Sequence, residues 1–99
     1  MALHIVSWKF KPELTEAQRE AARAELVPKL RALKDKIPFL TAIEVYCPPL
    51  PSSDCDLVLY SEVPEVAQLP LYQAHPDHQA VIPIIKRYFT ARRCVDIEL

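Results

Sequence analysis

The stretch Ala2-Leu3-His4-Ile5-Val6-Ser7-Trp8-Lys9-Phe10-Lys11 decides the fold of this 99-residue chain. Its side chains alternate at the two-residue period of a β-strand, so neighbours point to opposite faces of a sheet. One face carries His4, Val6, Trp8 and Phe10, and the other carries Leu3, Ile5, Ser7 and Lys9. Because both faces are apolar over the first half, we expect each face to pack against something.

Two helical regions and three further strands follow this strand. Thr15, with Gln18 three residues later, forms a capping-box pattern that starts a helix ending near Lys36. Pro28 lies inside that helix and cannot bond the carbonyl of Ala24, which predicts a bend or a division into two pieces. The second helical region covers Glu65–Ala74, breaks at His75-Pro76 and restarts at Pro76, and the further strands are Leu40–Cys47, Asp56–Val63 and Arg92–Glu98.

The order β-α-β-β-α-β predicts an α+β, ferredoxin-like fold, with an antiparallel four-stranded sheet and helices on one face. We expect residues 1–99 to form a single domain, since the chain is too short for two. No residues remain to cover the second sheet face, which Leu3 and Ile5 make apolar. The sequence therefore predicts a homodimer that pairs through its sheet faces.

Composition narrows the function classes. The chain has no Gly and no Asn. Phosphate-cradling loops need Gly for close backbone approach, so the composition excludes nucleotide-binding loops of this type. A net charge of −1 argues against nucleic-acid binding, and no apolar run is long enough to span a membrane. The three cysteines show no metal-binding spacing, which is typical of free thiols in the cytoplasm. We expect a cytoplasmic protein without a cofactor.

Several segments resemble the stress-responsive A/B barrel domains, a family of dimeric α+β barrels. The most specific is the run Tyr72-Gln73-Ala74-His75-Pro76-Asp77-His78. The others are His4-Ile5-Val6, Lys9-Phe10-Lys11, Leu33-Lys34 with Ile37-Pro38, Asp56-Leu57-Val58-Leu59 with Ser61-Glu62, and Val95-Asp96. The resemblance spans nearly the whole chain and implies the barrel fold and the dimer. Most members of the family have no established activity.

One branch of the family, similar to the plant olivetolic acid cyclase, closes a linear polyketide by aldol condensation. The resemblance implies a pocket between sheet and helices, with Tyr72 and His78 as an acid–base pair and His4 in the same pocket. A further pocket histidine of that cyclase is replaced by Leu57. Trp8 shares a strand face with His4, so it places a bulky ring in the pocket.

The residues themselves leave the role of His78 open. With Pro76 at the first helical position, His78 lies near the positive end of a helix, which favours neutral imidazole and hence a general base. Tyr72 could donate a hydrogen bond to a substrate oxygen. Alternatively, the run from His75 to His78 is a device for starting a helix, with His75 as its cap.

Three function classes follow from this. The chain could be an acid–base enzyme for a carbonyl-bearing apolar substrate, a binding module that uses the same pocket, or a structural dimer with a filled pocket. We expect His4, Trp8, Phe89 and Arg92 to line the pocket, with Arg92 able to hold a carboxylate. A zinc site formed by His4, His75 and His78 is a further alternative, which we do not expect because no Cys or carboxylate has suitable spacing.

Overall fold

The computed structural model describes residues 1–99, which form four strands and three helices. The order along the chain is β-α-β-β-α-α-β, because the second helical connection consists of two short helices. The elements are β1 (Ala2–Phe10), α1 (Glu16–Lys36), β2 (Ala42–Tyr46), β3 (Leu57–Val63), α2 (Gln68–Ala74), α3 (Pro76–Tyr88) and β4 (Phe89–Glu98).

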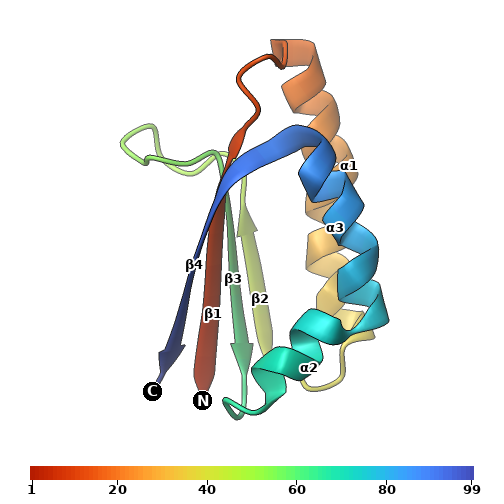
Figure 1. Ribbon diagram of the computed structural model, residues 1–99, viewed down its shortest axis with the longest axis vertical. Helices are drawn as coiled ribbons and strands as arrows, with labels where there is room; N and C mark the ends of the chain where they lie inside the picture. Colours follow the sequence, from red (N-terminus) through yellow and green to blue (C-terminus); the bar gives the residue numbers. More distant parts are fainter.

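The four strands form one antiparallel sheet in the order β2-β3-β1-β4. All three helices lie on the same side of this sheet, with α2 crossing near the end where the two termini lie (Figure 1). This is the ferredoxin-like arrangement that the sequence predicts. The two edge strands each have one partner, β3 for β2 and β1 for β4.

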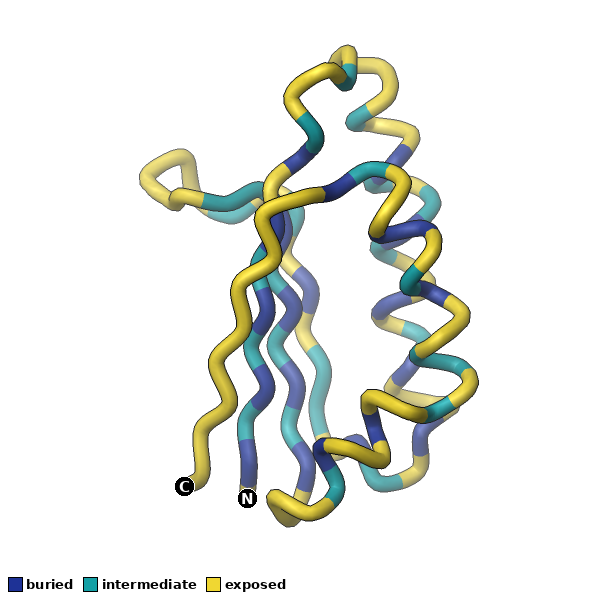
Figure 2. Tube along the Cα trace, viewed as in Figure 1, coloured by how far each residue is buried: buried dark blue, intermediate teal, exposed yellow.

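The core lies between the sheet and the helices. The apolar stripe of α1 is buried, and so are the β1 side chains of the His4 face. By contrast, every residue of β4 after Phe89 is exposed (Figure 2). The helices therefore cover β1 and β3 but leave β4 open to solvent. The buried α1 residues, together with the residue after the helix, are Ala22, Leu26, Leu30, Leu33 and Ile37.

The capping box at the start of α1 forms as predicted. The Gln18 backbone N–H donates to Thr15 Oγ1 at 3.1 Å, and the Thr15 N–H donates to Gln18 Oε1 at 2.7 Å. The predicted division at Pro28 is wrong, because α1 is a single helix from Glu16 to Lys36. Pro28 lies on the exposed face, where its ring disturbs no packing, and the buried leucines on either side hold the helix together.

Two element starts differ most from the sequence prediction, and the bounds of β2 and β3 differ by one or two residues. The helix expected from Glu65 begins at Gln68, because the preceding residues form turns. The last strand begins at Phe89 rather than Arg92, since Phe89 already pairs with Phe10 as α3 ends. The two phenyl rings stack with centroids 4.8 Å apart.

The sheet face that points away from the helices is largely apolar. Leu3 and Ile5 are half-buried there, and their β4 partners Val95 and Ile97 are 49% and 37% exposed. Tyr46 on β2 adds a further exposed ring on this face. No helix of the structure combines the length and the apolar character needed to cross a membrane.

Candidate functional site

A cavity of about 430 Å³ lies between the sheet and α3. Its walls are mainly apolar, and polar side chains of α3 and β4 stand where it meets solvent. This volume is within the range of small-molecule sites in proteins, roughly 300–1,000 Å³. The sequence-predicted residues that line it are His4, Trp8, His78, Phe89 and Arg92, and the other lining residues are Val6, Leu30, Leu59, Gln73, Gln79, Ile82, Ile85, Lys86, Thr90 and Ala91.

His78 lies in the first turn of α3 and has a defined ring orientation. Its Nδ1 is 3.1 Å from the backbone carbonyl oxygen of Gln73. A carbonyl only accepts hydrogen bonds, so Nδ1 carries the hydrogen and Nε2 of the neutral ring keeps a free lone pair. The role of Gln73 in this orientation was not predicted, because it depends on how the chain turns between α2 and α3.

The surroundings of His78 favour the neutral ring. Burial lowers the pKa of His78 below its ordinary value of 6.5, although the bond to Gln73 partly opposes this. The charges of His4 and Arg92 lower it further. The direction agrees with the sequence prediction, but burial is the main cause rather than the position at a helix end.

Tyr72 lies apart from the cavity. It is fully buried, and its ring packs edge-on between two imidazoles, with centroids 5.7 Å from His4 and 5.0 Å from His78. Its hydroxyl has no hydrogen-bond partner. Burial raises the pKa of Tyr72. The expectation that the Tyr72 hydroxyl opens on the cavity with His78 is therefore not met, because α2 directs this ring towards the sheet.

Arg92 reaches the cavity through an irregularity in β4. Ser7 pairs with Arg93 and Lys9 pairs with Thr90, so Trp8 faces two residues, Ala91 and Arg92. Ala91 has a φ of 55°, the left-handed conformation that is typical of one kind of β-bulge. Such bulges redirect side chains, and here both bulge residues line the cavity. Strand parity allowed this position for Arg92 but could not reveal the bulge.

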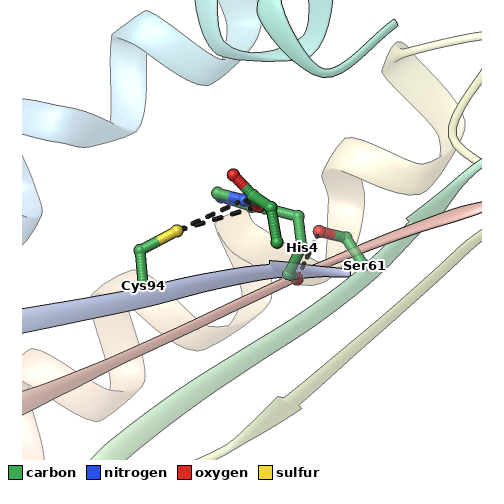
Figure 3. Close-up of polar contacts among 4 residues, drawn as sticks. His4, Ser61 and Cys94 are labelled. Atoms are coloured by element: carbon green, nitrogen blue, oxygen red, sulfur yellow. Dashed lines mark hydrogen bonds and ion pairs between the residues drawn. The ribbon is translucent and has the colours of Figure 1, made fainter. Parts of the chain in front are cut away.

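His4 is buried in the wall of the cavity. Its Nδ1 lies 2.5 Å from Asp96 Oδ1, across the β1–β4 pair. The Ser61 hydroxyl donates to the His4 backbone carbonyl at 3.1 Å (Figure 3). Sequence reasoning missed Asp96 as a site residue. The alternation of β4 could have indicated it, but only with the β1–β4 register known.

His75 has the structural role that the sequence favours. It is the cap residue of α3, and its Nδ1 accepts a hydrogen bond from the Asp77 backbone N–H at 3.2 Å. His75 does not line the cavity with His4 and His78. The three histidines therefore do not converge, and the alternative of a zinc site formed by His4, His75 and His78 is not met.

Solved structures with the same fold cover nearly the whole chain. A dimeric protein of unknown function with a ferredoxin-like fold from Bacteroides fragilis is 28% identical, with a TM-score of 0.90 over 99% of this chain and 95% of that one. A dimeric ferredoxin-like protein of unknown function from Thermobifida fusca is 24% identical, with a TM-score of 0.79 over 99% and 90%.

An enzyme also shares this fold. Hydroxynitrile lyase from Passiflora edulis is 12% identical, with a TM-score of 0.79 over 99% of this chain and 92% of that one. At this identity the likeness shows the fold alone. No curated protein matches the sequence. The family is shown by the sequence itself: residues 2–99 match the model of the stress responsive A/B barrel domain, and the chain belongs to that family.

Proposed function

We propose that this protein binds a small apolar molecule with an anionic group in the cavity between the sheet and α3. The observation that carries the proposal is the cavity itself, about 430 Å³ with mainly apolar walls. Trp8 and Phe89 line this space without filling it, which favours a binding site over a filled structural core. Arg92 and Lys86 supply positive charge at the solvent side, where a carboxylate or sulfonate would be held by charge-assisted hydrogen bonds.

An anionic naphthalene dye, 1-anilinonaphthalene-8-sulfonate, tests this proposal because it combines apolar rings with a sulfonate. We expect saturable binding, read from dye fluorescence, that Arg92→Gln weakens about fivefold or more, as loss of one charge-assisted bond implies. Arg93→Gln is the matched control, because Arg93 pairs with Ser7 on the opposite face of the sheet. We expect it to leave binding unchanged.

A second pair of variants tests the location of the dye. Ile82→Trp fills the cavity and should reduce binding, whereas Leu71→Trp on the exposed face of α2 should not. Equal effects of Arg92→Gln and Arg93→Gln, or unchanged binding in Ile82→Trp, would show that the dye binds elsewhere. Either result would contradict the proposed site.

A second candidate function is acid–base catalysis on a carbonyl-bearing apolar molecule. The specific observation that favours it is the orientation of His78, whose bond to Gln73 leaves Nε2 as a free base. In this reaction Nε2 takes a proton from the carbon next to a carbonyl, and the same proton or one from solvent returns to that carbon. Tyr72 would assist only after its hydroxyl moves into the cavity, so His78 carries this candidate.

Deuterium exchange into nonane-2,4-dione, followed by NMR, tests the catalytic candidate. We expect the protein to accelerate exchange at the carbon between the two carbonyls, and His78→Ala to abolish the acceleration while dye binding persists. Tyr72→Phe keeps the packing of the ring and removes the hydroxyl that could donate a hydrogen bond. If exchange survives Tyr72→Phe, His78 acts alone. Exchange no faster than in buffer, with dye binding intact, would leave the binding function and exclude this catalysis.

We also propose that the protein is a homodimer in the cytoplasm. The apolar outer sheet face of Leu3, Ile5, Val95 and Ile97 supports pairing of two sheets. The printed description of the Bacteroides fragilis relative as dimeric is in line with this. Three free cysteines, none of them paired, suit a reducing compartment.

A further inference from the structure

The β1–β4 register brings three metal-ligating side chains together outside the apolar part of the cavity. His4 pairs with Asp96, and Val6 pairs with Cys94, so the three ligating residues share the helix-facing side of the sheet. Cys94 Sγ lies 3.7 Å from His4 Nδ1 and 3.8 Å from Asp96 Oδ1, and the nitrogen–oxygen distance is 2.5 Å. Figure 3 shows the Cys94 sulfur pointing from β4 towards the His4 ring.

These contacts do not form a nucleophilic triad. A Cys-His-Asp relay needs the thiol at one ring nitrogen of the histidine and the carboxylate at the other. Here the sulfur and the carboxylate oxygen both approach Nδ1 of His4. Three potential ligand atoms that converge from three side chains leave a point between them at which a cation can be placed.

The distances are close to those of a tetrahedral zinc site. Zinc bonds of 2.3 Å to sulfur and about 2.0–2.2 Å to nitrogen and oxygen imply ligand–ligand separations of about 3.4–3.6 Å. The two distances to the Cys94 sulfur are within about 0.4 Å of that range. The hydrogen-bonded pair of His4 and Asp96 must open by about 1 Å as the metal replaces the proton between them. Asp96 is exposed and therefore has room to move.

His4 is the fixed member of this cluster. It is 2% exposed, its ring packs against Tyr72, and its backbone carbonyl accepts the Ser61 hydroxyl. Cys94 and Asp96 lie on an exposed strand, so ion and solvent can reach them. A ligand set of one rigid buried imidazole and two accessible anionic groups neutralises a divalent cation when the thiol is deprotonated.

We propose that His4, Cys94 and Asp96 form a Zn²⁺ site with three protein ligands and one open coordination position. A water molecule completes the tetrahedron, which is the arrangement of catalytic rather than purely structural zinc sites. Binding displaces the Cys94 thiol proton, so affinity increases with pH. The site does not rest on the proposed function. Only one of its three ligands, His4, also lines the cavity.

Titration with Co²⁺ at pH 8, followed by displacement with Zn²⁺, tests this site. We expect one metal ion per chain, the visible absorption bands of tetrahedral cobalt and a near-ultraviolet thiolate-to-cobalt band. Cys94→Ser should abolish the thiolate band, and both Cys94→Ser and Asp96→Asn should weaken binding about tenfold or more. Both substitutions fall on an exposed strand, so they test the site without disturbing the packing of the buried His4.

Cys55→Ser is the matched control for the thiol, and His75→Gln is the control for the surface histidine of α3. We expect both variants to keep the spectrum and the affinity of the unmodified protein. The proposal is wrong if the unmodified protein shows no thiolate-to-cobalt band. It is also wrong if the band persists in Cys94→Ser or is lost in Cys55→Ser, because another thiol would then be the ligand.

Discussion

At the residue scale, the proposed chemistry of the cavity depends on His78, whose ring has a defined hydrogen-bonding pattern. The Gln73 carbonyl fixes the hydrogen of the neutral His78 ring on Nδ1, and partial burial keeps the ring neutral. Gln73 and His78 are five residues apart, on either side of the break between α2 and α3. The His-Pro step therefore has a function beyond ending a helix, because it sets the direction of the imidazole.

The lowered pKa of His78 predicts a stability change in mild acid. Well above its ordinary pKa of 6.5 the ring is neutral in both the folded and the unfolded chain, so it causes no pH dependence there. Just below that value the unfolded chain takes up a proton that the folded chain does not, so the free energy of unfolding falls as the pH decreases. Urea denaturation between pH 7.5 and pH 5 should show this fall.

His78→Gln should reduce the acid-dependent part of that fall. Gln79→Ala provides the comparison, because Gln79 also lines the cavity but does not titrate. We expect it to keep the acid dependence of the unmodified protein. An identical acid dependence in His78→Gln would mean that other groups cause the destabilisation.

The sequence could predict which residues face the cavity better than it could predict their contacts. Strand alternation placed His4 and Trp8 on the helix-facing side, and both line the cavity. The position of Tyr72 depends on the tilt of α2 against the sheet, which no local pattern encodes. The same limit explains Asp96, since its meeting with His4 requires the register of two strands that are distant in sequence.

At the scale of elements, α1 shows a long helix that tolerates an interior proline. Pro28 leaves the carbonyl of Ala24 without its usual helical N–H partner, yet the helix continues to Lys36. The sequence predicted the start of the helix correctly, because a capping box is a local interaction. It did not predict continuity through Pro28, because that depends on the packing of buried leucines against the sheet.

Pro28→Ala should stabilise the protein by about 1–2 kcal/mol. Alanine restores the missing hydrogen bond and relieves a helix cost of about 3 kcal/mol, while the unfolded chain gains entropy that offsets part of this. Chemical denaturation measures the difference. Pro51→Ala, in the exposed loop between β2 and β3, should give no such gain. Unchanged or reduced stability in Pro28→Ala would show that α1 needs the proline geometry.

At the scale of the whole molecule, the two faces of the sheet have different surroundings. The inner face contributes to one core with the helices, and the outer face keeps apolar side chains that no element of the chain covers. The number and order of the elements follow from the sequence, because each strand and helix has its own periodicity.

Val95→Lys should convert the proposed dimer into a monomer. Val95 is 49% exposed and pairs with Ile5 on the outer face, so a charge there opposes sheet-to-sheet packing of roughly 1,200 Å² or more. Light scattering at micromolar concentration reports the mass. Leu50→Lys, in a loop with 76% exposure, is the control and should stay dimeric. A monomeric unmodified protein, or a dimeric Val95→Lys variant, would contradict pairing through this face.

The left-handed backbone at Ala91 has a consequence for the kinetics of ligand exchange. A side chain in this conformation costs about 1–2 kcal/mol relative to the right-handed region, and β4 is held by hydrogen bonds to a single neighbouring strand. Stored strain lowers the free energy of local opening, so we expect the amides around Ala91 to exchange hydrogen faster than those of β1. Because Ala91 and Arg92 line the cavity, we expect opening of this strand to shorten the residence time of a molecule bound at the proposed site.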